Sequence, residues 1–165
     1  MREPETYWCE SRSEFQAATA RLLGLARHQI WLLDPNFDDW LIDTIATVSL
    51  ISEALQRSRQ AQIEQMPLTL LVNDPEWIEQ NAPRLMAIRR RQSSAFETKQ
   101  IPAQYQRQES VLLVDNQHAV IRPHKSSFRA KVIVGQPSEV EHRAAKLRQI
   151  RDLASHCLQA TTLGL

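Results

Sequence analysis

The run Leu68–Val72, with the sequence Leu-Thr-Leu-Leu-Val, constrains the fold more than any other segment of this 165-residue chain. It is almost continuously apolar, and strands of this kind are typical of parallel sheets that are buried on both faces. Asp74 and Pro75 follow it, and a capping side chain before a proline indicates that a helix begins there. The segment therefore predicts a strand followed by a helix, the repeating unit of an α/β domain.

Other segments alternate in the same way. Phe15 and Leu22 belong to an apolar helical repeat that begins after a capping box at Ser11 and Glu14, which predicts a helix over about 13–27. Further strands are predicted over 6–10, 29–33, 95–99, 111–114, 119–121 and 131–134, and further helices over 40–58, from 75 with a restart at 83, and over 138–157. We expect one α/β domain over 1–165, with a mixed, mostly parallel sheet of about six or seven strands and helices on both faces.

Composition excludes several functional classes. The chain has three glycines, which is too few for a Walker loop or a GxGxxG nucleotide fingerprint, and no cofactor is expected. Its two cysteines form neither a disulfide framework nor a zinc motif. No apolar run reaches the length of a bilayer span and no signal segment is evident, so a cytoplasmic protein without a membrane role is expected.

Charge argues against nucleic acid as a partner. The formal net charge is only +1, although residues 67–165 hold 14 basic and 9 acidic side chains while residues 1–66 hold 6 and 10. No helix-turn-helix or ribonucleoprotein motif is present. Nucleic-acid binding through the basic C-terminal half stays an alternative, ranked below the others.

Three aspartates offer a metal-dependent alternative. Asp34, Asp38 and Asp39 follow a predicted strand, and ligands bind beyond the carboxyl ends of such strands. Carboxylate oxygens suit Mg²⁺, so a metal-dependent phosphoesterase is one hypothesis. Asn36 stands where a phosphatase of the haloacid dehalogenase type needs a second aspartate. The competing interpretation is structural, with Asp34 ending the strand and a later aspartate capping the next helix.

The pattern from Gln29 to Val134 resembles one half of a phospholipase D superfamily domain. The strand at 30–33, the helix at 41–58 and the strand at 68–72 follow that layout, and Ser110–Asp115 looks like the strand that carries the motif His-x-Lys-x4-Asp. The chain is also similar to a proteobacterial family that is sometimes associated with acetyltransferase domains. The resemblance implies a phospholipase D-like fold and pairing of two halves, hence a homodimer or a protein partner, which an acetyltransferase could supply.

The motif is incomplete. Gln108 stands at the histidine position and Ser110 at the lysine position, and only Asp115 matches. An amide cannot replace a nucleophilic imidazole, and a hydroxyl carries no charge to stabilise phosphate. We therefore expect no catalysis by this motif. The favoured function is a non-catalytic module for interaction or anion binding.

A basic segment replaces the small and polar residues that the family carries after its hairpin. Arg122, His124 and Lys125 are candidates for binding a phosphate-like anion, with Asp115 expected to face Arg122 across the hairpin. The alternatives are an exposed basic turn and a purely structural ion pair.

Overall fold

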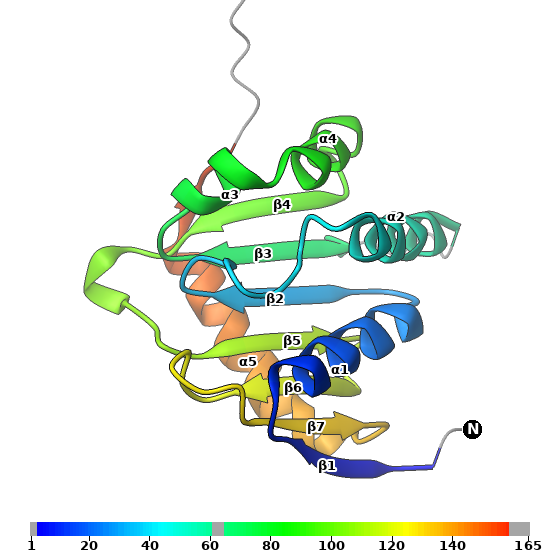
Figure 1. The fold of residues 1–165 in the computed structure, drawn as a ribbon. Helices are drawn as coiled ribbons and strands as arrows, with labels where there is room; N and C mark the ends of the chain where they lie inside the picture. Colours follow the sequence, from blue (N-terminus) through cyan, green and yellow to red (C-terminus); the bar gives the residue numbers. More distant parts are fainter. Residues whose placement is uncertain (1–2, 61–64, 159–165) are drawn as a thin grey trace, which may run out of the picture.

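A single mixed sheet organises the computed structural model, which describes residues 3–60 and 65–158. In those residues the sheet has eight strands in the order β1-β7-β6-β5-β2-β3-β4-β8 (Figure 1). The strands are β1 Glu5–Cys9, β2 Ile30–Asp34, β3 Leu68–Val72, β4 Phe96–Gln100, β5 Ser110–Val114, β6 His118–Arg122, β7 Ala130–Val134 and β8 Ser155–His156.

Parallel pairing is confined to the middle of the sheet. β2 pairs with β3 and β3 with β4 in parallel, whereas the other five pairings are antiparallel. The prediction of a mixed sheet is confirmed, but the expectation that most of it is parallel and that it has six or seven strands is wrong. The hairpin β5–β6 adds antiparallel strands beside β2. The short strand β8 lies within the segment 138–157, where the apolar spacing predicted a helix.

Helices cover both faces of the sheet, as expected. The helices α1 and α2 and the pair α3 and α4 pack on one face, and α5 packs alone on the other (Figure 1). Successive strand residues point to opposite faces, so Leu70 contacts the first layer while Leu71 contacts the α5 side. The helices are α1 Arg12–Leu25, α2 Ile45–Gln60, α3 Glu76–Asn81, α4 Pro83–Arg91 and α5 Pro137–Leu153, with a short 3₁₀ turn η1 at Ala103–Tyr105.

Local signals specify the starts of α1 and α4. Ser11 accepts a hydrogen bond from the Glu14 amide at 3.2 Å, which confirms the first capping box. Pro83 begins α4 and so separates it from α3. The last helix was predicted over 138–157, but α5 begins at Pro137 after Gln136, whose side chain makes no capping bond, and it ends at Leu153. In the part of the chain that the structure describes, no helix is long and apolar enough to cross a bilayer.

Candidate functional site

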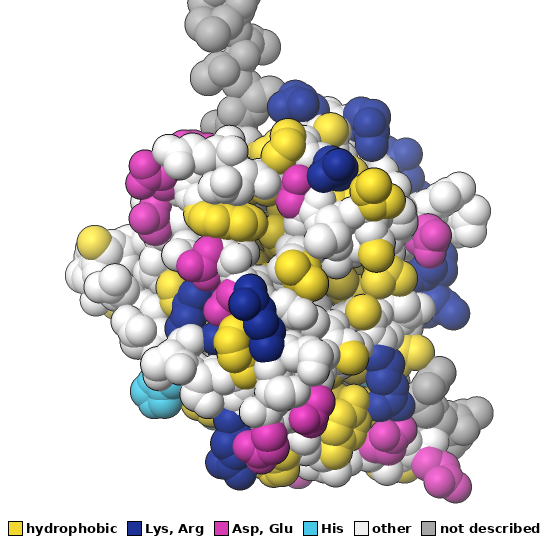
Figure 2. Space-filling view, in the orientation of Figure 1, with side chains coloured by type: hydrophobic (Ala, Val, Ile, Leu, Met, Phe, Trp, Pro, Cys, Tyr) yellow, Lys and Arg dark blue, Asp and Glu magenta, His cyan; other side chains and the backbone are white. Residues whose placement is uncertain are grey.

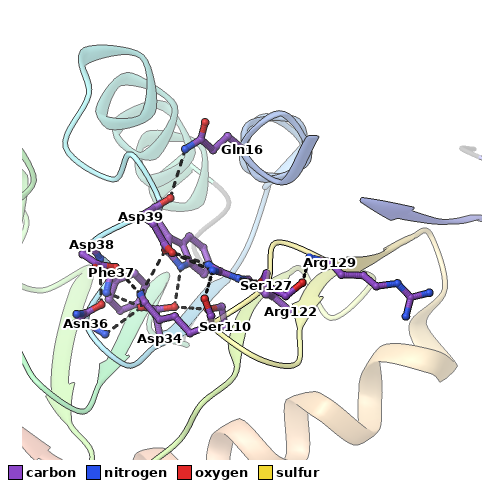
Figure 3. A network of polar contacts seen from close by, with 12 residues as sticks. Gln16, Asp34, Asn36, Phe37, Asp38, Asp39, Ser110, Arg122, Ser127 and Arg129 are labelled. Carbon is purple, nitrogen blue, oxygen red and sulfur yellow. Dashed lines mark hydrogen bonds and ion pairs between the residues drawn. The ribbon is translucent and has the colours of Figure 1, made fainter. Parts of the chain in front are cut away.

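A cluster of charges, most of them buried or half-buried, lies where β2 and β6 end (Figure 3). β2 supplies Asp34, the loop after it supplies Asp38 and Asp39, β6 ends in Arg122, and the loop after β6 supplies Lys125. We call these five residues the ion-pair cluster. They are distant in sequence, but β5 runs antiparallel to β2 and β6 antiparallel to β5, so β6 runs in the same direction as β2 and the two strands end at the same end of the sheet.

Strand register also brings a motif position into contact with the cluster. Leu33 of β2 pairs with Val111 of β5, and Ser110 of β5 pairs with Arg122 of β6. Asp34 and Ser110 therefore lie next to each other, and the Ser110 hydroxyl donates a hydrogen bond to Asp34 Oδ1. Ser110 is fully buried, so this motif position faces the cluster rather than solvent.

Asp34 is fully buried and uses both carboxylate oxygens. Oδ1 also accepts from Trp40 Nε1 at 3.0 Å, and Oδ2 accepts from the amides of Asn36 and Phe37 at 3.0 and 2.6 Å. The two amide bonds turn the chain after β2, where Phe37 adopts a φ of 65°. With Ser110 and Lys125 the carboxylate has five donors against roughly four lone-pair sites. No oxygen of Asp34 is left for a metal ion or for nucleophilic attack.

The guanidinium of Arg122 is fully buried and uses four of its five N–H donors. It donates to both oxygens of Asp39, at 3.1 and 3.0 Å, in the bidentate geometry that suits arginine. It also donates to the carbonyls of Ser127 at 2.6 Å and Lys125 at 2.5 Å. Its face lies over the Phe128 ring, 4.2 Å from the centroid.

The ammonium of Lys125 lies among three carboxylates. Its Nζ is 2.5 Å from Asp34, 2.9 Å from Asp38 and 3.4 Å from Asp39. Burial by itself lowers the pKa of Lys125, but the charge of Asp34, its hydrogen bond and the other carboxylates outweigh burial and raise it. Burial likewise raises the pKa of Asp39, yet the hydrogen bond from Arg122 and the charge of Lys125 hold it below its ordinary value. The opposite charges around them thus stabilise the ionised forms of Lys125 and Asp39.

The three predicted metal ligands do come together, but around a lysine. Lys125 Nζ stands where a cation between Asp34, Asp38 and Asp39 would stand. In residues 3–60 and 65–158, no group of three or more histidine, cysteine or acidic side chains is arranged to hold a metal ion. The hypothesis of a metal site at these aspartates is therefore corrected. Sequence reasoning grouped the three aspartates correctly, but it assigned Lys125, which fills the space between them, to a separate anion site.

The expected pairing of Asp115 with Arg122 is wrong. Asp115 lies in the β5–β6 turn, at the opposite end of β5 from the cluster, and Arg122 pairs with Asp39. The Asp115 carboxylate accepts from the amides of Arg27, His28 and Gln29 at 2.9, 2.7 and 2.9 Å. The surviving motif aspartate thus fixes the chain between α1 and β2.

The remaining predicted residues border the cluster. Gln108 is exposed, and its carbonyl accepts from the Lys125 amide at 3.0 Å. His124 is exposed, and its carbonyl accepts from the Ser127 amide at 3.1 Å. Of the three candidate anion-binding residues, only His124 presents its side chain to solvent without a carboxylate bound to it, and the anion site stays a prediction.

Sequence reasoning missed the partners that complete the cluster. The indole of Trp40 and the ring of Phe128 contact Asp34 and Arg122, and neither follows from motif spacing. One signal was present: Asp34 and Arg122 each end a strand of apolar residues, and a charge in that position needs an opposite charge nearby.

Comparisons with known proteins show the family and the fold. The sequence model of the family described as "Domain of unknown function (DUF7931)" matches residues 11–163. No curated protein sequence matches the chain significantly. Among solved structures, Nuc from Salmonella typhimurium, a phospholipase D family member, has a TM-score of 0.62 at 14% identity, and the match covers 94% of this chain and 99% of Nuc.

Two further structures match over part of their length. TrmBL2, an archaeal chromatin protein with a novel mode of DNA binding, has a TM-score of 0.67 at 12% identity and covers 92% of this chain. Phosphatidylserine synthase from Haemophilus influenzae Rd KW20 has a TM-score of 0.64 at 12% identity and covers 98% of this chain. This chain spans only 54% of TrmBL2 and 41% of the synthase. At these identities the likeness shows the fold alone, and that fold is phospholipase D-like, as the resemblance implied.

Proposed function

The chain belongs to the DUF7931 family, and we propose that it is a non-catalytic phospholipase D-like module that acts by binding a partner. One observation carries the proposal: the ion-pair cluster fills the end of the sheet where the phospholipase D motif would act. Ser110, at the lysine position of that motif, is buried against Asp34 and is itself a donor to that carboxylate. The nucleophile and its charged helper are both missing, and a lysine bound by three carboxylates occupies the space.

Electrostatics also oppose a phosphodiester substrate here. A phosphodiester carries negative charge, and this end of the sheet presents Asp34, Asp38 and Asp39 against Lys125 and Arg122. Both cations are already neutralised, so an incoming phosphate would have to displace a carboxylate from a buried, hydrogen-bonded ion pair. Loss of one partner from such a pair costs about 3–5 kcal/mol, which an exposed phosphate cannot offset.

The test is turnover of a generic phosphodiester. We expect purified protein to hydrolyse bis(p-nitrophenyl) phosphate no faster than buffer, with or without Mg²⁺, Mn²⁺ or EDTA. The matched variants are Asp34→Asn, in the cluster, and Asp115→Asn, at the surviving motif position outside it. Turnover above buffer that either variant abolishes would contradict the proposal. Turnover abolished by EDTA would restore the metal-dependent alternative.

The partner itself is a separate part of the proposal. The resemblance to one half of a paired enzyme supports a homodimer or a complex with another protein, and an acetyltransferase is the class that the resemblance suggests. TrmBL2, one of the similar structures, is described as binding DNA, which adds nucleic acid as a partner class. Co-purification from the native cell, followed by mass spectrometry and nuclease treatment, distinguishes these partners.

A further inference from the structure

Arginines gather at the end of the sheet opposite the ion-pair cluster. Arg57 and Arg59 lie in the last turn of α2, Arg90 and Arg91 in the last turn of α4, and Arg27 follows α1. We call these five residues the arginine edge. Lys and Arg side chains line the upper right margin of the molecule, over α4 and the end of α2 (Figure 2).

The topology explains why these residues converge. Each of α1, α2 and α4 is the helix that leads into the next strand, β2, β3 or β4, and these three strands are parallel neighbours. The C-terminal ends of all three helices therefore lie at the end of the sheet where β2, β3 and β4 begin. Arg57 links two of them, donating from Nε to the Ala26 carbonyl at 2.8 Å, and α2 packs against α4. Strands lie about 4.8 Å apart, so the three strand starts span roughly 10 Å.

The arginines at this edge face little opposing charge within the described residues, where the Asp115 carboxylate accepts a hydrogen bond from the Arg27 amide at 2.9 Å. None of the five arginines forms an ion pair there, whereas nine other basic side chains do. The last two turns of α1, α2 and α4 carry one acidic residue, Glu53. Arg27, Arg59, Arg90 and Arg91 are exposed.

Helix dipoles explain only part of this arrangement. Cations near a helix C-terminus are favourable, and Arg57 makes such a contact with the end of α1. Arg89 is buried and donates to Thr98 Oγ1 at 3.2 Å, so it too has a structural role. Among the described residues, the exposed guanidinium groups of Arg59, Arg90 and Arg91 make no hydrogen bond to a helix carbonyl and are open to solvent.

From this edge we infer that the chain binds the phosphate backbone of nucleic acid, independently of sequence. The inference names a partner for the non-catalytic module proposed above and rests on that proposal. Arginine binds phosphate through a planar fork, and the edge contains arginine and no lysine. A nucleic-acid strand presents one phosphate per about 3.4 Å, so a span of roughly 10 Å faces two or three phosphates of one strand.

An acidic protein fits this edge less well. Protein interfaces are built around apolar and aromatic anchors. None of the exposed large hydrophobic side chains among the described residues lies in the last turn of α1, α2 or α4; they are Trp8, Leu41, Ile45, Tyr105 and Leu153. The opposite end of the parallel strands is acidic, with Asp38, Asp74, Glu76 and Glu79 exposed. The molecule therefore presents opposite charges at the two ends of one sheet, which orients it on a polyanion.

The experiment measures binding of a fluorescein-labelled 20-base-pair DNA duplex by anisotropy at 50–200 mM NaCl. We expect affinity to fall with salt, with a log–log slope no steeper than about −4.5 for five arginines. The variant Arg59→Gln/Arg90→Gln/Arg91→Gln should lose at least tenfold in affinity at 50 mM NaCl. The control Arg12→Gln/Arg84→Gln/Arg129→Gln removes the same charge elsewhere and should lose less than threefold. Circular dichroism melting confirms that both variants fold.

Three outcomes would overturn the inference. The first is an equal loss of DNA affinity in the two triple variants, and the second is the absence of salt-dependent binding at 50 mM NaCl. The third is tighter binding of poly-glutamate than of DNA at equal charge, which would assign the edge to an acidic protein. The same duplex is inspected for cleavage. Cleavage would contradict the non-catalytic proposal and leave the arginine edge intact, whereas a lack of binding would remove the edge and leave that proposal intact.

Discussion

Arg122 is the side chain on which the ion-pair cluster depends most, because its guanidinium is fully buried and pairs with Asp39 through two hydrogen bonds. Removing one partner of a buried pair leaves an uncompensated charge, which costs about 3–5 kcal/mol. We expect Arg122→Met to lose that much unfolding free energy in urea. The double variant Arg122→Met/Asp39→Leu should recover a large part of it, because neither charge is then left alone.

The effect of added phosphate on the melting temperature distinguishes a structural role of Arg122 from a role in an anion site. If Arg122 and Lys125 bind a phosphate-like anion, the parent melts higher as phosphate is added, following the logarithm of its concentration. We expect no such rise, because both cations already hold carboxylates. A rise that disappears in Arg122→Met would show that the anion site exists.

Asp115 illustrates a motif residue with a structural role. Its carboxylate accepts three amides of the α1–β2 connection, and each of those donors loses its partner in Asp115→Ala. A buried unpaired donor costs about 1–3 kcal/mol, and these amides are partly exposed, so we expect a total loss in the lower part of that range. Asp115→Asn keeps an accepting oxygen and should lose less. Unfolding curves that do not distinguish Ala from Asn would argue against this capping role.

At the scale of elements, the ends of β2 and β6 hold opposite charges whose pKa values move apart. The pKa of Asp39 is lowered, so its contribution to stability is present above the unfolded value of about 3.9 and is lost as pH falls through the folded value. The pKa of Lys125 is raised, so its contribution is present below about 10.4 and is lost as pH rises through the folded value. We expect the stabilisation by the cluster to be full between about pH 4 and pH 10.

The measurement is the urea midpoint of the parent and of Arg122→Met/Asp39→Leu from pH 2 to pH 11. The parent should lose more stability than the double variant on the acid side, where Asp39 is protonated. Parallel pH profiles for the two proteins would mean that Asp39 does not contribute in this way.

The elements themselves were largely predictable, because local signals specify them. Leu68–Val72 is β3 at its predicted bounds, and the hairpin of β5 and β6 matches its predicted strands. The helix predicted over 40–58 begins instead at Ile45, because Asp34 accepts amides of the loop after β2 and Leu41 adopts a φ of 55°. Such turn conformations in the loop after β2 are not visible in the apolar periodicity.

The candidate site was predictable in its residues but not in its partners. Asp34, Asp38, Asp39, Arg122 and Lys125 were all singled out, yet as two separate sites, one for a metal and one for an anion. They form one cluster because β5 and β6 insert next to β2 and bring residues about 90 positions apart into contact. Sheet order is a property of the fold and cannot be read from local spacing.

At the scale of the whole molecule, net charge concealed the distribution of charge. A total of +1 argued against a polyanionic partner, but the parallel strands place acidic loops at one end and helix-terminal arginines at the other. The resemblance to one half of a paired enzyme predicts a homodimer. Sedimentation velocity at high micromolar concentration should show a dimer, and a strictly monomeric species would leave only pairing with a different partner.

The most direct test of the central claim is the titration of Lys125 itself. The claim is that its ammonium is held within the protein by Asp34, Asp38 and Asp39 and is not available to a phosphate ligand. Side-chain ¹⁵N resonances of lysine, assigned with Lys125→Arg, report its pKa and its neighbours. We predict that Lys125 titrates above the ordinary lysine value of about 10.4 and that 10 mM phosphate leaves its resonance unchanged. A pKa at or below that value, or a resonance that shifts as phosphate is added, would contradict the account.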